Sequence, residues 1–167
     1  GLAFLLAAGG WARGSAQALA LIAGTTSLAL LCFAFGGALL SGRPIAQRLG
    51  WTPARLSWPV HVGLVLGLLA TSQLVEWAIA LGGYGEVGTL AEFRGTVSGT
   101  PGATLLPVLV GLALLPAFGE ELALRGWIQR GLAPRLGAPL AVVLASALFG
   151  LLHGDAVHAA GAFVLGL

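Results

Sequence analysis

The chain has 167 residues, of which 57% are hydrophobic and 8% are charged, and its formal net charge is +2. Soluble domains carry about 25% charged residues, so this composition excludes an ordinary soluble domain. All the basic residues are arginine and they form no run along the chain, which argues against a nucleic-acid partner. The apolar stretches are continuous, whereas a membrane barrel would alternate in polarity. We therefore predict an all-α, polytopic transmembrane helical bundle. Because the chain begins at Gly1 without a methionine and ends at Leu167 inside an apolar run, we expect the protein to be truncated at both ends.

Two complete membrane spans are predicted in the first half of the chain, at about 17–40 and 60–81. The loop between them, 41–59, contains three arginines, and the region 125–137 contains three more. The excess of arginine in cytoplasmic loops predicts that both of these regions lie in the cytoplasm. The segment 82–103 is rich in glycine and threonine and is predicted to be a loop with a short surface helix.

The second half of the chain is predicted to contain one long helix over about 104–132. Its second half is polar, and Pro116 is expected to kink it because proline removes an internal hydrogen bond. The chain is then expected to turn between Gly131 and Pro139. A further span is predicted at about 139–153, and a last helix begins near Val157.

Three ionisable residues interrupt the long apolar helix: Glu120, Glu121 and Arg125. A charged side chain at the centre of a bilayer costs roughly 2.5–3.5 kcal/mol on insertion scales, so these groups need a compensating role. Glu121 and Arg125 are spaced i, i+4 and are predicted to form an ion pair on one helix face. Glu120 is rotated by about 100° and has no partner at that spacing, which makes its carboxylate a candidate general base. The alternative is that all three residues form a solvated helix end at the membrane surface.

A second group of residues follows at Phe149 and His153, which are one helical turn apart on the same predicted face. His153 is a candidate for binding a metal, orienting water or carrying a proton. The alternative is a histidine that caps a helix end near water. Asp155 is predicted to be the N-cap of the following helix. Glu76, in the span 60–81, is interpreted as an interfacial residue, with substrate gating as the lesser alternative.

The order Glu-Glu-x-x-x-Arg followed by Phe-x-x-x-His resembles the CPBP (Abi) family of intramembrane proteases, which includes the type II CAAX prenyl endopeptidases. The matching residues are Glu120, Glu121, Arg125, Phe149 and His153. The resemblance divides the chain into N-terminal transmembrane helices and loops, 1–103, and a catalytic core, 104–167. A later histidine motif of the family would lie beyond Leu167, so we expect the core to be incomplete at its C-terminus. His158 is not expected to replace that motif, because it lies five residues after His153.

The resemblance implies an endopeptidase that cleaves a membrane-associated peptide or protein near its C-terminus. Glu120 and His153 would activate the attacking water. Glu121, the third residue of the catalytic group, would support the site together with Arg125 and Phe149. The family has often been described as metalloproteases, so a divalent metal such as zinc is open, with Glu120 and His153 as its ligands.

Prenylated tails, sorting tails and bacteriocin precursors all stay open as substrates, and a bacterial inner membrane is the expected location. A non-enzymatic scaffold, an immunity protein or a transporter-like protein is the alternative function, because transporters also keep ionisable groups within the membrane.

Overall fold

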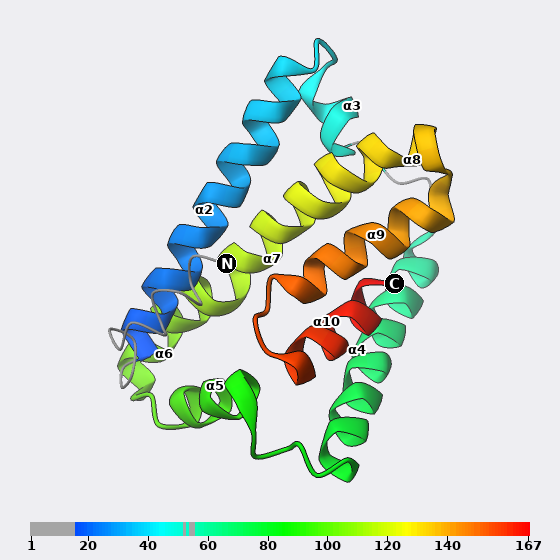
Figure 1. The fold of residues 1–167 in the computed structure, drawn as a ribbon. Coiled ribbons are helices and arrows are strands. Elements are labelled where there is room, and N and C mark those ends of the chain that lie inside the picture. The colour runs from blue at the N-terminus through cyan, green and yellow to red at the C-terminus, as the bar shows by residue number, and fades with distance from the viewer. Residues whose placement is uncertain (1–15, 52, 54–55) are drawn as a thin grey trace.

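The fold is an all-helical bundle. The computed structural model describes residues 16–51, 53 and 56–167, and no strand occurs in this part of the chain (Figure 1). The beginning of the predicted N-terminal part, and Arg55 of the basic loop, lie outside the described residues.

Three helices are long and apolar enough to cross a membrane: α2 (Ala16–Leu40), α4 (Trp58–Leu81) and the continuous helical run Gly102–Leu136. α2 has 25 residues and α4 has 24, and about 20 residues suffice to span a bilayer core of ~30 Å. The predicted fold class and the spans at 17–40 and 60–81 are therefore confirmed.

The long helical run is not a regular α-helix. π-helical segments alternate with α-helical ones along it. Its segments are α6 (Gly102–Leu109), η1 (Val110–Leu114), α7 (Leu115–Glu120), η2 (Glu121–Gln129) and α8 (Arg130–Leu136). Pro116 has no N–H to offer the carbonyl of Leu112, four residues earlier. We attribute the wider turns of η1, which contains Leu112, to this missing hydrogen bond. Single π turns inside helices are often found at functional sites.

The helical run also ends later than the sequence predicted. It continues past Pro134 to Leu136. The turn is confined to Gly137, whose φ of 81° is a conformation that glycine adopts without steric cost. The expected turn from Gly131 to Pro139 therefore began too early, because the conformation of Gly137, and not the proline, ends the helix.

Glycines let the long helical run pack closely against α2. An added Cβ at Gly111 would lie 2.7 Å from the carbonyl oxygen of Ala20, and one at Gly119 would lie 2.7 Å from that of Ser27. The buried side of α2 is correspondingly small. It consists of Ala16, Ala20, Gly24, Ser27, Ala34 and Ala38. Small residues at helix contacts let backbones approach closely, which is the usual packing of membrane helices.

The chain ends in a helical hairpin of α9 (Ala138–Leu151) and α10 (Ala156–Gly166), and α10 also packs against α4 (Figure 1). α9 has 14 residues and therefore extends about 21 Å, which is less than the ~30 Å bilayer core. The prediction of a complete span at 139–153 is therefore not met, because α9 is too short.

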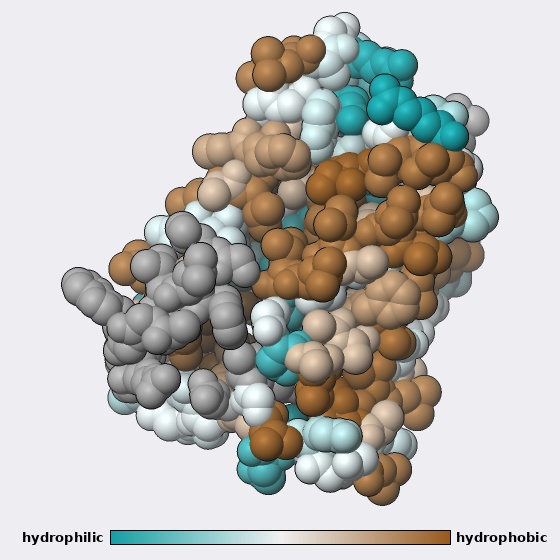
Figure 2. All heavy atoms as spheres, in the orientation of Figure 1, coloured by the Kyte–Doolittle hydropathy of each residue, from teal (hydrophilic) through white to brown (hydrophobic). Residues whose placement is uncertain are grey.

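Two short helices lie in the connections, α3 (Ile45–Leu49) and α5 (Gly88–Ser98). α5 confirms the surface helix predicted within 82–103, whereas α3 was not predicted. α3 and α8 lie at one end of the molecule and α5 lies at the other (Figure 1). This arrangement puts the described parts of the two arginine-rich regions on the same side. On the face shown in Figure 2, apolar residues cover much of the middle, and hydrophilic residues gather at the end that carries α3.

Candidate functional site

The segment η2 positions the first part of the candidate site. Nη1 of Arg125 lies 3.2 Å from Oε1 of Glu121, so the predicted ion pair is confirmed. The Arg125 side chain is 22% exposed and that of Glu121 is 60% exposed. Both residues lie in η2, which is π-helical. The turns of a π-helix are wider than those of an α-helix, so Arg125 still lies about one turn after Glu121. The pair therefore forms although the α-helical geometry assumed for it was wrong.

Arg125 connects this helix to the hairpin. Its guanidinium carbon lies 4.5 Å from the ring centre of Phe149 on α9, a distance at which a cation is attracted to an aromatic face. Gly166, near the end of α10, leaves room for the arginine, because a Cβ there would lie 3.2 Å from Nη2 of Arg125. The arginine therefore contacts both helices of the hairpin.

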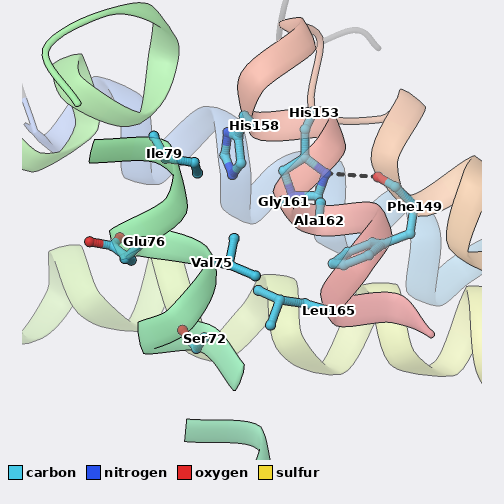
Figure 3. A pocket seen from close by; sticks show the side chains of 10 residues that line it. All are labelled: Ser72, Val75, Glu76, Ile79, Phe149, His153, His158, Gly161, Ala162 and Leu165. Carbon is cyan, nitrogen blue, oxygen red and sulfur yellow. Dashed lines mark hydrogen bonds between the residues drawn. The ribbon is translucent and has the colours of Figure 1, made fainter. Parts of the chain in front are cut away.

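Phe149 in turn fixes His153. The two ring centroids are 4.8 Å apart in an edge-to-face arrangement, and Nδ1 of His153 lies 2.7 Å from the carbonyl oxygen of Phe149 (Figure 3). A carbonyl oxygen accepts hydrogen bonds and cannot donate them, so Nδ1 carries the proton. In the neutral imidazole, Nε2 is then the atom with a free lone pair. This nitrogen is available to accept a proton or to orient a water molecule.

A second histidine, His158, belongs to the same site, which sequence reasoning missed. Its ring centroid lies 4.3 Å from that of His153. The predicted N-cap at Asp155 is confirmed, because Oδ1 of Asp155 accepts hydrogen bonds from the backbone N–H groups of Val157, at 3.1 Å, and His158, at 2.9 Å. The cap starts α10 directly after the turn, and the chain reversal returns His158 to His153. The predicted N-cap at Asp155 could have indicated this contact, because a new helix that starts at Asp155 requires the chain to turn between the two histidines.

The two imidazoles open into a cavity of about 230 Å³ between α4 and the hairpin (Figure 3). Its lining residues are Ser72, Val75, Glu76, Ile79, Phe149, His153, His158, Gly161, Ala162 and Leu165. The carboxylate of Glu76 points away from the histidines (Figure 3) and pairs with Arg94 of α5 at 3.1 Å. Both of these side chains are about half exposed. Apart from Glu76 and Ser72, the wall facing the histidines is apolar, so this space suits an apolar chain beside a reactive group.

Glu120 lies at the end of α7 and is half-buried. It forms no hydrogen bond or ion pair with another described residue, while Arg125 and Glu121 are the charged groups that act on it. Among the described residues, Glu121 thus contacts Arg125, Arg125 contacts Phe149, and Phe149 contacts His153. Glu120 is the neighbour of Glu121 in the chain.

The donor groups of the site do not fit a metal centre with three protein ligands. The described residues contain no group of three or more His, Cys, Asp or Glu side chains placed to hold a metal ion. A catalytic zinc site takes three such ligands and leaves one position open. The described residues alone therefore do not supply the ligand set of such a site.

Long apolar helices around a cavity with ionisable groups define a polytopic membrane protein. Residues 102–167 match the model of a protease family, described as type II CAAX prenyl endopeptidase Rce1-like. This segment of the chain is similar to that CPBP/CAAX protease family, which confirms the resemblance seen in the motifs. No curated protein and no solved structure matches the chain.

Proposed function

We propose that the protein is an intramembrane endopeptidase that hydrolyses a membrane-associated peptide or protein near its C-terminus. The observation that carries the proposal is the contact series from Arg125 through Phe149 to His153, which lies within the segment that matches the protease family. The cavity next to His153 supports it, because a substrate chain needs room beside the reacting groups.

In the proposed reaction, Glu120 accepts a proton from a water molecule, and the water oxygen attacks the carbonyl carbon of the scissile peptide bond. The proton then passes to the leaving amine as the carbon–nitrogen bond breaks. Nε2 of His153 orients the water, since Nδ1 is held by the carbonyl of Phe149. Glu121 and Arg125 keep the charge beside Glu120 balanced, and Phe149 holds Arg125 and His153 in place.

We assign residues 104–167 to the catalytic core and residues 1–103 to the supporting helices and loops, with α4 closing one side of the cavity. We place the protein in a bacterial inner membrane, with the arginine-rich end on the cytoplasmic side. A peptide with a prenylated Cys-a-a-X tail is the first substrate to test, because the matching family is described as prenyl endopeptidases.

The test compares Glu120→Gln and His153→Ala in the full-length protein in lipid nanodiscs. The probe is a fluorogenic peptide with a prenylated Cys-a-a-X tail, run beside the unprenylated peptide, a sorting-tail peptide and a bacteriocin precursor. General-base catalysis contributes about 10²–10⁴-fold, so each variant is expected to lose at least about 100-fold in turnover. Unchanged turnover in both variants would refute the assigned roles. Cleavage of none of the peptides by the unmodified protein would favour the non-enzymatic alternatives.

Matched controls are present in the same chain. His61, like His153, places Nδ1 near the carbonyl oxygen of the residue four positions earlier, at 3.0 Å from Ser57. It is exposed at the start of α4 and does not line the cavity. Glu86 is an exposed carboxylate in the connection before α5. His61→Ala and Glu86→Gln are therefore expected to keep full turnover.

A further inference from the structure

Three arginines that are far apart in the sequence meet at the end of the molecule that carries α3 and α8. Arg43 follows α2, Arg48 lies in α3 and Arg130 begins α8. They line a second cavity of about 360 Å³. Its remaining lining residues are Gln47, Ala133 and Pro134. This cavity lies outside the candidate active site and shares no lining residue with it.

Two glycines make room for the guanidinium groups: Gly131 of α8 faces Arg48, and Gly50, after α3, faces Arg130. A Cβ at Gly131 in α8 would lie 2.8 Å from Nη2 of Arg48, and a Cβ at Gly50, after α3, would overlap the guanidinium of Arg130. Gly50 also has a φ of 75°, which suits glycine. The arginines of α3 and α8 are thus held in spaces that a larger residue would fill.

Arg48 is fixed from two further sides. Its guanidinium carbon lies 3.7 Å from the ring centre of Trp127, a cation–π contact. Its Nη1 is 3.5 Å from the carbonyl oxygen of Gly126. Arg48 is therefore a preorganised cation, and the exposed Arg43 and Arg130 line the same cavity.

The positive charge of this pocket is not neutralised by carboxylates. No acidic residue lines this pocket among the described residues. The ion pairs of the described chain lie elsewhere and use Arg94 and Arg125. Burial lowers the pKa of the Arg48 guanidinium, and the charges of Arg43 and Arg130 lower this pKa further. Like charges are thus held together at an electrostatic cost that a bound anion would relieve.

We propose that the pocket of Arg43, Arg48 and Arg130 binds a phosphate group, carried by an anionic lipid headgroup or by free phosphate. The planar guanidinium group matches phosphate oxygens in bidentate geometry, and Gln47 adds an amide donor. The helices that carry the pocket, α3 and α8, lie at one end of the long apolar helices (Figure 1), where lipid headgroups would lie. Basic pockets at that depth are known to recognise anionic headgroups. The proposal does not depend on the proteolytic function.

Native mass spectrometry of the full-length protein in detergent tests the proposal with three probes: phosphatidylglycerol, phosphatidylcholine and inorganic phosphate. Phosphatidylglycerol is expected to bind more tightly than zwitterionic phosphatidylcholine. Arg43→Gln and Arg130→Gln are each expected to weaken its binding about fivefold, the loss expected for one basic residue beside an anionic surface. Arg135→Gln removes the same charge from the same helix but outside the pocket, so it is expected to have little effect.

Gly131→Ala provides a variant in which the charge is unchanged. The new Cβ displaces the flexible end of Arg48, while alanine favours the helix by up to about 1 kcal/mol, so unfolding cannot account for a loss of binding. Weaker phosphate or phosphatidylglycerol binding in Gly131→Ala supports the site. Inorganic phosphate binding that needs these arginines, without preference for phosphatidylglycerol, identifies free phosphate as the ligand. Equal binding in all variants, or equal losses in Arg135→Gln, would overturn the proposal.

Discussion

Replacing Gly119 with alanine is expected to disturb the packing of α7 on α2. The added Cβ would lie 2.7 Å from the carbonyl oxygen and 3.0 Å from the Cα of Ser27. Both of these are backbone atoms of a long helix, so neither can turn aside as a side-chain end could. The two helices must therefore separate by about 0.7 Å to reach ordinary contact, and the loss of close packing is the source of the destabilisation.

The size of this effect follows from two opposing contributions. Overpacking of a well-packed contact costs about 1–3 kcal/mol, whereas alanine is favoured over glycine in a helix by about 1 kcal/mol. A Cβ added at Gly36, in α2, would meet no atom of a neighbouring helix within 4 Å, so Gly36→Ala is expected to show the helix gain alone. The free energies of unfolding of the two variants are therefore expected to differ by about 1–3 kcal/mol.

Unfolding by sodium dodecyl sulphate in mixed micelles measures both variants against the unmodified protein. Peptide turnover supplies the second measurement, because Glu120 directly follows Gly119 in the chain. A misplacement of about 1 Å costs on the order of 100-fold in rate, so Gly119→Ala is expected to lower turnover by about tenfold to 100-fold. If Gly119→Ala proves as stable as Gly36→Ala, the close contact between α7 and α2 does not limit the packing at Gly119.

Three further predictions concern single contacts, and each can be checked by unfolding in mixed micelles. The double-mutant cycle of Arg125→Met and Phe149→Leu is expected to give a coupling energy of about 0.5–2 kcal/mol, and a coupling near zero would remove the proposed link between η2 and α9. Ser146 is fully buried and its hydroxyl has no hydrogen-bond partner in the described chain, so Ser146→Ala is expected to be neutral or stabilising by about 1 kcal/mol, and a marked loss would indicate an unseen partner. Asp155→Ala is expected to cost about 1 kcal/mol through the lost cap of α10, with Asp155→Asn costing less because asparagine also caps helices, and equal losses in both would argue for a role of the charge instead.

The contacts that sequence could predict are local ones. The Glu121–Arg125 pair, the Phe149–His153 contact and the Asp155 cap each join residues two to four positions apart. Over such distances the helical period nearly fixes which side chains meet. The long spans were predictable for a related reason, because their length is set by the thickness of the bilayer.

The parts that sequence did not predict depend on how distant segments come together. The chain reversal after α9 returns His158 to His153, and five positions along a straight helix would have kept them on different faces. The arginine pocket brings together Arg48 of α3 and Arg130 of α8, which are far apart in the sequence. The π-helical turns of η2 were also missed, because that segment contains no proline that would signal them.

The π-helical segment η2 connects the two polar regions. Two of its residues make cation–π contacts with other helices: Arg125 contacts Phe149 of α9, and Trp127 contacts Arg48 of α3. Gly126, between them, approaches the backbone of Leu49, where an added Cβ would lie 3.0 Å from the carbonyl oxygen. In a regular α-helix each residue advances by about 100°, whereas the wider turns of a π-helix advance less. Regular α-helical geometry over the same residues would change the angle between Arg125 and Trp127. One helical segment thus contacts the proposed active site through Arg125 and the arginine pocket through Trp127.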